Sequence, residues 1–373
     1  MKSTSELRPD FLVIGSGIAG LRAAIELAAT GKVLVLTKSK PRESNTEYAQ
    51  GGVAVALSEE DEVSLHLHDT LKAGDGLCNE EAVKILVEEG PRLINQLIEW
   101  GTQFDRKGTR LAFAREGAHS RCRVLHSRGD STGHEIMRAL LAKAGMLKNI
   151  ELRPFAFVVD LCGSGGSVEG VEFLDEAKKG VRRVRTRRIL LATGGLGQVY
   201  RETTNPLVAS GDGVALAYRA GAVVSDMEFV QFHPTVLYQK GAPRFLLSEA
   251  LRGEGAVLRN LELERFMPHY HEGADLAPRD VVSRAIVTET RRLRSEFVYL
   301  DLTGLDPGRV RKRFPRIYET CLSCNIDITA DLIPVLPAAH YAMGGVHTDL
   351  EGRSSLPGLY AAGEVAANGV HGA

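Results

Sequence analysis

The segment Ser44–Gly52, SNTEYAQGG, holds the densest set of groups that could bind a flat cofactor ring. The two glycines at its end let a backbone approach a ring closely. Hydroxyl and amide groups for a heteroaromatic edge come from Ser44, Asn45, Thr46 and Gln50. Because the segment lies one short connection beyond a glycine-rich turn, it predicts the floor of a flavin site.

That turn, GSGIAG from Gly15 to Gly20, has the spacing of a dinucleotide-binding loop. It follows the apolar run 11–14 and opens an apolar-periodic helix to Thr30, and Lys32–Leu36 reads as a second buried strand. Gly15 is expected to allow the tight turn, Gly17 to admit a pyrophosphate, and Gly20 to let helix and strand pack closely. The pattern predicts the start of a βαβ unit.

The end of the second strand departs from the simple fingerprint. The acidic residue that would bind ribose hydroxyls is replaced by Thr37-Lys38, so a preference for unphosphorylated NAD is not supported. Lys38 suits three roles: binding the 2′-phosphate of NADP, binding the adenosine end of FAD, or facing solvent.

Composition narrows the class of protein. With 373 residues, 44% hydrophobic and 25% charged content, the chain is a globular protein of two or three domains. A net charge of −1 gives no reason to expect nucleic acid or an anionic membrane as a partner. Five scattered cysteines fit a reducing cytoplasm, and the lone CxxC, Cys321 and Cys324, lacks further ligands for a metal site. The N-terminal MKSTSELRPD predicts no signal peptide, and no membrane span is expected.

The remaining segments supply elements that would position these groups. Residues 80–101 predict two amphipathic helices, the second starting at Pro91, and Asp130 or Ser131 is expected to cap the next helix. Residues 150–190 predict a β-meander whose basic run, 178–188, is a solvated hairpin face. The run ends in a buried strand that delivers Thr193 and Gly194 to the carboxyl edge of a sheet, where α/β folds bind ligands.

Five motifs in order resemble the succinate dehydrogenase/fumarate reductase flavoprotein family: GSGIAG, SNTEYAQGG, LLATGG, SGDG (Ser210–Gly213) and LYAAGEV (Leu359–Val365). The resemblance covers essentially the whole chain. It implies an α/β fold: a Rossmann-like FAD-binding domain, 1–226 and 341–373, with an inserted α+β capping domain, 227–340. The site residues expected for FAD are Gly15, Ser16, Gly17, Ala19, Gly20, Lys38, Ser44, Asn45, Thr46, Gln50, Gly51, Gly52, Thr193, Gly194, Asp212 and Glu364.

Two positions separate this chain from the respiratory members that it resembles. Those members hold FAD covalently through a histidine where this chain has Asn45, whose amide cannot form that bond, so FAD is expected to be non-covalent. In the loop REGAHS, Glu116 stands where respiratory members have glutamine. A carboxylate suits a substrate ammonium group, although an ordinary surface glutamate is the simpler interpretation.

The expected cap carries the other substrate-site residues, again by resemblance. The blocks MEFVQFHPTVLY, SEALRGEGA, LAPRDVVSRAI and LPAAHYAMGGV contain His233, Glu249, Arg252, Arg279 and His340. Arginine forks and histidines suit the carboxylates of a C4 dicarboxylate. The resemblance gives Arg279 the proton exchange, with Glu116, His233 and His340 as catalytic partners and Glu249 and Arg252 as substrate-binding residues. Taken singly, each histidine or arginine could instead be structural.

The implied function is FAD-dependent oxidation of L-aspartate to iminoaspartate, with oxygen or fumarate as acceptor, in NAD biosynthesis through quinolinate. A hand-off to quinolinate synthase would follow. A soluble fumarate reductase or succinate dehydrogenase flavoprotein is the alternative. The chain stops at VHGA, Val370–Ala373, where the resemblance implies a further substrate arginine and then a helical domain. Without that C-terminal helical domain we expect weak FAD retention and little activity, so an inactive flavin-binding fragment is the third interpretation.

Overall fold

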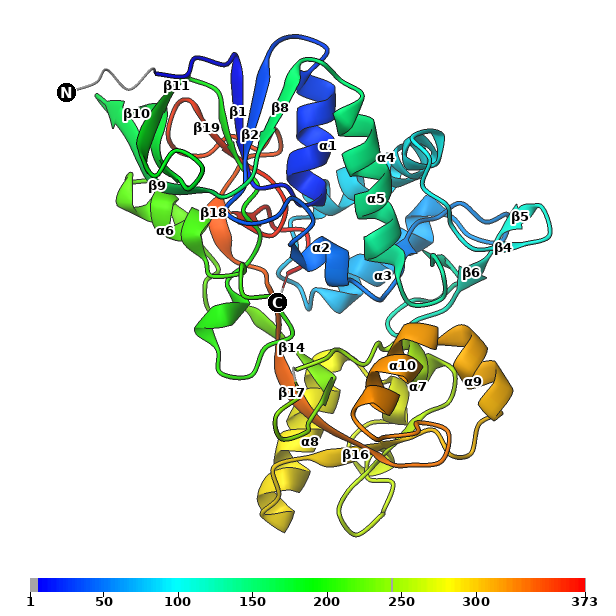
Figure 1. Cartoon of the computed structure of the whole chain (residues 1–373). Coiled ribbons are helices and arrows are strands. Elements are labelled where there is room, and N and C mark those ends of the chain that lie inside the picture. The colour runs from blue at the N-terminus through cyan, green and yellow to red at the C-terminus, as the bar shows by residue number, and fades with distance from the viewer. Residues whose placement is uncertain (1–5, 243, 373) are drawn as a thin grey trace.

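The computed structural model describes residues 6–242 and 244–372. Residues 1–5, the start of the N-terminal segment that predicts no signal peptide, and Ala373, the last residue of VHGA, lie outside the described residues. Figure 1 shows two bodies, an upper body (residues 6–229 and 343–372) and a lower body (residues 230–342). Two long strands, β14 and β17, run from the region between the bodies into the lower one (Figure 1). The domain boundaries expected from sequence stay predictions.

A five-stranded parallel sheet forms the centre of the upper body. Its order is β19 (Leu359–Ala361), β12 (Ile189–Leu191), β1 (Phe11–Ile14), β2 (Val33–Leu36) and β8 (Ile150–Arg153). The predicted strand, turn and helix are confirmed, since β1 is followed by α1 (Ile18–Leu27) and β2.

The two faces of this sheet pack against different partners. Alternate residues, such as Leu12 and Leu34, face an antiparallel meander, while Val13 and Val33 face α1. Helix α5 (Thr132–Gly145) packs beside α1, and α6 (Asp212–Arg219) lies against the meander. This side-chain alternation, with period two, turns an all-apolar strand pattern into a three-layer body.

The predicted meander is shorter than 150–190. Only β9 (Ala156–Ser164), β10 (Ser167–Asp175) and β11 (Gly180–Arg185) form it, whereas β8 and β12 belong to the parallel sheet. Side-chain alternation alone does not reveal whether a strand's partner is its neighbour in sequence or a distant parallel strand. The basic run is a solvated hairpin face, as predicted, with Arg183 paired to Glu172 and Arg187 to Glu169.

The two helices expected over 80–101 are one helix, α4 (Glu80–Glu99), with Pro91 inside it. Asn79 caps its start, and the buried face continues across the proline through Val87 and Ile94. A proline removes only one helical hydrogen bond and clashes with one carbonyl. The continuous apolar face therefore outweighs the local break.

The cap prediction for α5 was also wrong. Ser131 is the residue before the helix, but its side chain makes no capping bond. The Asp130 carboxylate instead accepts the backbone N–H of Ile317 at 2.8 Å and of Arg316 at 3.3 Å. Asp130 thus caps α10 (Pro315–Ser323), a helix of the lower body, and ties the two bodies together.

Short elements complete the upper body. Its remaining helices are α2 (Asn45–Tyr48) and α3 (Val63–Ala73), with a 3₁₀ turn, η1 (Gly197–Val199). Its small sheets contain β3 (Val53–Ala54), β7 (Val124–Leu125) and β6 (Phe113–Ala114); β4 (Arg106–Lys107) and β5 (Arg110–Leu111); and β13 (Val224–Ser225), β18 (Gly345–His347) and β20 (Ala366–Ala367). Across the described parts of the chain, none of the helices combines the length and the apolar character needed to cross a membrane.

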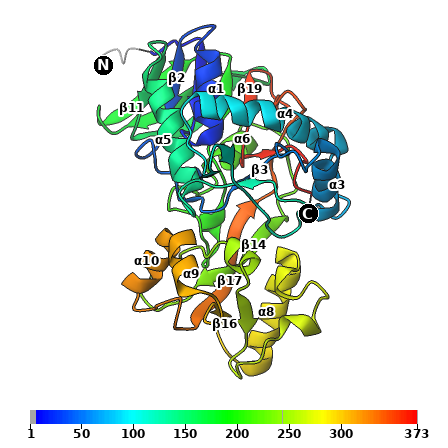
Figure 2. The ribbon, with the colours of Figure 1, turned by 90° about the vertical axis from the view of Figure 1, so that its right-hand side faces the viewer.

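An antiparallel sheet and helices form the lower body, seen from a second side in Figure 2. The sheet order is β14 (Val230–Leu237), β17 (Ile333–Ala342), β16 (Val298–Asp301) and β15 (Val257–Arg259). The helices are α7 (Ala250–Gly253), α8 (Arg279–Leu293), α9 (Pro307–Arg313) and α10, with 3₁₀ turns η2 (Met267–His269) and η3 (Ala274–Leu276). Helix α8 packs on β14, so its first residue, Arg279, comes to the β14 side of the interface between the bodies.

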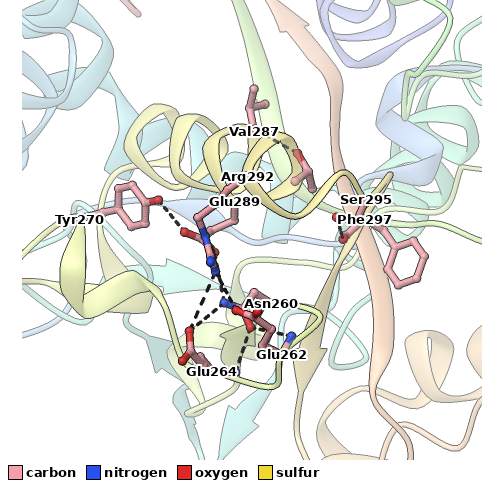
Figure 3. Close-up of polar contacts among 10 residues, drawn as sticks. Asn260, Glu262, Glu264, Tyr270, Val287, Glu289, Arg292, Ser295 and Phe297 are labelled. Carbon is pink, nitrogen blue, oxygen red and sulfur yellow. Dashed lines mark hydrogen bonds and ion pairs between the residues drawn. The ribbon is translucent and has the colours of Figure 1, made fainter.

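A polar cluster centred on buried Glu289 anchors the far end of α8 (Figure 3). The Glu289 carboxylate accepts hydrogen bonds from Asn260 at 3.1 Å, Tyr270 at 2.7 Å and Arg292 at 2.9 Å. Burial and this carboxylate raise the pKa of Tyr270 to about 12. Arg292 also reaches Glu262, so the loop after β15 is joined to α8.

Replacing Glu289 with alanine is expected to lower the free energy of unfolding by about 2–3 kcal/mol, because fully buried Asn260 loses an acceptor and Arg292 a charged partner. Urea unfolding followed by circular dichroism measures the change. Glu319→Ala, at an exposed position on α10, is the control and should cost less than about 0.5 kcal/mol. An equal loss in both variants would contradict an anchoring role for Glu289.

Candidate active site

A cavity of about 1070 Å³ opens at the carboxyl ends of β1, β2 and β12 and extends to residues of the lower body. This is the edge at which parallel α/β sheets bind ligands. The cavity is lined by all the predicted cofactor residues except Gly20.

The glycine turn beneath this cavity has the geometry that a dinucleotide needs. Gly15 has φ +112°, and a Cβ there would lie 2.1 Å from the carbonyl oxygen of Ala192. A Cβ on Gly20 would lie 2.0 Å from the Gly15 carbonyl oxygen, so Gly20 lets α1 pack against the turn. Gly17 has no side chain to cap α1; the Ile18 N–H donates to Thr46 Oγ1 at 3.3 Å, and the N–H groups that follow it at the helix start are available to a ligand.

The side chains along the cavity also fit FAD. The buried oxygens Asn45 Oδ1, Gln50 Oε1 and Thr193 Oγ1 have no hydrogen-bond partner among the described residues. Buried polar groups are rarely left unpaired, and these three line the cavity. A cofactor with a polar heteroaromatic edge would satisfy them, so the residues present fit a flavin.

Other predicted cofactor residues are paired across the cavity. The Asn45 amide donates to Glu364 at 2.8 Å, and burial raises the pKa of that carboxyl. Lys38 forms an ion pair with Asp212 and lines the cavity. Of the three roles suggested for this lysine, the structure therefore disfavours the one in which it extends into solvent. The described residues include no group of three or more His, Cys, Asp or Glu side chains suited to a metal ion.

A charged cluster stands beside the cavity at the start of α8. Arg279 Nε donates to Glu249 Oε2 at 2.6 Å and Nη1 to Gln231 Oε1 at 3.0 Å. Arg252 is fully enclosed, and its Nη2 lies 3.8 Å from Glu249 Oε1. Burial alone would raise the pKa of Glu249, but Arg279 and Arg252 bring it below its ordinary value. Glu249 is therefore an ionised partner shared by two arginines.

Two histidines extend the cluster to the cavity. The rings of His233 and His340 are 5.3 Å apart, and His340 lines the cavity with Nδ1 2.8 Å from the Thr204 hydroxyl. Burial, with the charge of Arg279, lowers the pKa of His340 to about 3. The same causes hold the pKa of His233 well below its usual range. Both rings are neutral at physiological pH and can donate hydrogen bonds without adding charge.

These neutral histidines give a pH prediction. The unfolded chain binds a proton at each histidine with a pKa near 6.5, whereas folded His340 binds one only near pH 3. Stability from this group is therefore complete above about pH 6.5 and is lost as pH falls. When the pH falls from 7.5 to 5, the unchanged chain should lose about 2 kcal/mol of unfolding free energy through His340. The His340→Gln variant should lose about 2 kcal/mol less over the same pH range. Urea unfolding at both pH values tests this, and equal losses in the two chains would contradict it.

The loop that carries Glu116 lies against this cluster. A Cβ on Gly117 would lie 2.0 Å from Glu249 Oε1, so the loop backbone contacts that carboxylate directly. The Glu116 side chain is partly buried, with Oε1 3.0 Å from His126 Nε2. The structure thus brings the backbone of the Glu116 loop to Glu249, the partner of the predicted arginines, although only His340 of the predicted lower-body residues lines the cavity.

Sequence reasoning missed three residues of this site. Gln231, which holds Arg279, lies two positions before His233, so strand alternation could have placed both side chains on one face. Thr204, the partner of His340, and His126, the partner of Glu116, carry no such signal because each contact joins separate elements. His271, left as structural from sequence, accepts the Gly273 N–H at 2.9 Å.

Comparison with known proteins defines the class. The family described as "FAD binding domain" matches residues 10–373. The chain is 47% identical to chloroplastic L-aspartate oxidase of Arabidopsis thaliana, covering 100% of this chain and 59% of that protein. It is 45% identical to L-aspartate oxidase of Yersinia pestis, covering 100% of this chain and 72% of that protein. An E. coli quinol fumarate reductase structure matches with a TM-score of 0.94 and 33% identity, covering 99% of this chain and 66% of that one.

The fold and cavity are those of an FAD-binding flavoprotein, and FAD is the cofactor. The chain belongs to the succinate dehydrogenase/fumarate reductase flavoprotein family, and curated relatives at 44% to 48% identity to it are L-aspartate oxidases. It spans about three fifths of the length of the plant relatives, at 58% to 59%.

Proposed function

We propose that this chain is the FAD- and substrate-binding part of an enzyme that oxidises L-aspartate to iminoaspartate, the first step of NAD biosynthesis through quinolinate. The observation that carries the proposal is Glu116, a carboxylate whose loop contacts the Glu249–Arg279 pair. An ammonium group needs an anionic partner that succinate does not. Sequence relatives that carry the name L-aspartate oxidase support the same substrate.

The charges around the proposed substrate site fit an amino dicarboxylate. Arg252 is buried with Nε and Nη2 lacking hydrogen-bond partners among the described residues, although Nη2 lies within ion-pair distance of Glu249. Neutral His233 and His340 add hydrogen-bond donors that stay uncharged above the low pKa values set by burial. Carboxylates would meet these donors while the ammonium meets Glu116.

FAD, when bound in this cavity, would supply the two-electron acceptor for the oxidation. Arg279 is the proposed proton-exchanging group, held at Nε by Glu249 and at Nη1 by Gln231. An arginine rarely gives up its proton, so the proton exchange must depend largely on how precisely the guanidinium is positioned against the substrate. The ionised Glu249 keeps the guanidinium in one orientation and balances its charge.

A soluble fumarate reductase or succinate dehydrogenase flavoprotein is the second candidate, favoured by the fold match at a TM-score of 0.94. The variant Glu116→Gln separates the two. If Glu116 binds the ammonium, turnover of L-aspartate falls while reduction of fumarate survives. Equal loss of both activities would favour the second candidate.

The direct test of the proposal is anaerobic addition of L-aspartate to the FAD-loaded chain. Bleaching of the flavin absorbance is expected, followed by recovery on addition of oxygen or fumarate. A chain that reduces fumarate but leaves its flavin oxidised under L-aspartate would refute the proposal. Because the chain spans 59% of the Arabidopsis relative, a chimera that adds the remaining part of that relative is run beside it.

The chimera also tests the third interpretation, a flavin-binding fragment without activity. If the chain is such a fragment, it will retain FAD weakly and turn over little L-aspartate by itself, and the chimera will gain both. Tight FAD and full bleaching by L-aspartate in the chain alone would contradict this third interpretation.

Non-covalent FAD is part of the proposal because Asn45 donates its amide to Glu364 and offers no nucleophilic nitrogen. Acid precipitation of the flavin-loaded protein is expected to leave the yellow colour in the supernatant. Flavin that stays with the protein pellet would contradict this prediction.

Acceptors, partner and compartment are proposed with the activity. Oxygen or fumarate would reoxidise the flavin, giving hydrogen peroxide or succinate, and quinolinate synthase would take up the unstable iminoaspartate. The cytoplasm is the proposed compartment, on the ground that all five cysteines are free. The plant relatives are named chloroplastic, so fractionation of cells that express the chain is the test.

A further inference from the structure

His126 lies enclosed at the base of the loop that carries Glu116. Its side chain is 5% exposed, and Nε2 is 3.0 Å from Glu116 Oε1. A carboxylate can only accept, so Nε2–H donates to it. The bond uses one oxygen of Glu116 and leaves the carboxylate with capacity for a second donor.

The chain fixes His126 relative to the flavin segment. It directly follows β7, which pairs with β3, the strand that begins after Gly52. A Cβ on Gly52 would lie 3.1 Å from His126 Cε1 and still closer to Val124. The imidazole therefore stands between the flavin segment Ser44–Gly52 and Glu116, so it sets the position of that carboxylate relative to the flavin floor.

The rest of the loop is already held in place. Ser120 donates its N–H and hydroxyl to Asp69 at 2.8 and 2.7 Å, and Arg115 Nε donates to the His119 carbonyl at 3.0 Å. Ala118 has φ +63°, a conformation that a non-glycine residue adopts only when its surroundings enforce it. The Glu116 side chain keeps three torsions of its own, and the His126 bond is what restricts them.

We propose that His126 is a specificity-determining positioning residue, which holds the Glu116 carboxylate in the place where it selects an amino dicarboxylate over one without an ammonium group. This inference rests on the proposed function, because it takes Glu116 as the ammonium partner. Without the bond, Glu116 would have to be ordered when the ligand binds, at a cost in side-chain entropy. The ligand without an ammonium group would lose nothing.

The test compares two variants of similar size. In His126→Gln the amide nitrogen reaches as far as Nε2, whereas in His126→Asn it falls short. L-Aspartate and succinate are titrated calorimetrically against the FAD-loaded chain after reduction by dithionite, so that neither ligand can react. The measured quantity is the ratio of the two dissociation constants. His126→Asn is expected to lower the preference for L-aspartate about tenfold, and His126→Gln less than about threefold.

A double-mutant cycle separates positioning from general loosening of the fold. In a Glu116→Gln background, His126→Asn should change the ratio less than about twofold, because the carboxylate that it positions is gone. His269→Asn, at an exposed site, is the control and should leave the ratio unchanged.

Three results would overturn the inference: an unchanged ratio in His126→Asn, the same change in both backgrounds, or a ratio in His126→Gln as low as in His126→Asn. If His126→Asn does not fold, His126→Gln decides, since a ratio outside threefold overturns the inference. If Glu116→Gln itself leaves the ratio unchanged, it is the proposed function that fails.

Discussion

Arg279→Lys is expected to slow reduction of the flavin by L-aspartate by a factor of about 10²–10⁴, the range in which a single proton-transfer group contributes. Lysine places all its donors on one nitrogen, so it cannot meet Glu249 and Gln231 with the fixed fork that Nε and Nη1 of Arg279 provide at 2.6 and 3.0 Å. Anaerobic stopped-flow spectroscopy of the flavin absorbance measures the rate.

The matched control for that prediction is Arg284→Lys on the same helix, whose side chain is 72% exposed and pairs with Asp280 one turn away. It should leave the rate within about twofold. If Arg279→Lys and Arg284→Lys reduce at equal rates, proton exchange must be assigned to another group of the cluster.

The sequence predicted the elements whose signals are local. The βαβ start follows from a buried strand, three glycines and an apolar helix face that lie within 26 consecutive residues, 11–36, and β1, α1 and β2 have those places. The predicted helix break at Pro91 was wrong because tertiary packing outweighs the local effect of the proline: Val87 and Ile94, on either side of it, lie on one buried face of the helix. The partners of β8 and β12 could not be predicted for the same reason, since a parallel register is set by strands far away in the chain.

Prediction of the site depended on resemblance more than on spacing. Glu249 and Arg252 share one block, but Arg279 lies in another, and nothing in the sequence says that one carboxylate holds both arginines. That these residues share one site was predicted only from the family resemblance of their motifs. Contacts absent from those motifs, such as His126 with Glu116, needed the folded chain.

The two bodies meet at this site, where the backbone of the loop with Glu116 contacts the charged Glu249 side chain. The loop with Glu116 belongs to the upper body, whereas Glu249 and Arg279 belong to the lower one. Asp130, which caps α10 across the interface, holds a second contact between the same bodies. A substrate site assembled in this way depends on how closely the loop backbone can approach Glu249.

Gly117→Ala is therefore expected to lower turnover of L-aspartate about 100-fold while it changes the melting temperature by less than a few degrees. The added methyl would lie 2.0 Å from Glu249 Oε1, and that carboxylate must move because the loop is fixed at Ser120 by Asp69. Movement of Glu249 removes the 2.6 Å bond that orients Arg279, so the loss falls on catalysis, where small misplacements are costly. Gly145→Ala, with open space around its Cβ, is the control for the substitution itself and should keep full turnover. Full turnover in Gly117→Ala as well would mean that Glu249 can shift without consequence, and Arg279 would then need another group to orient it.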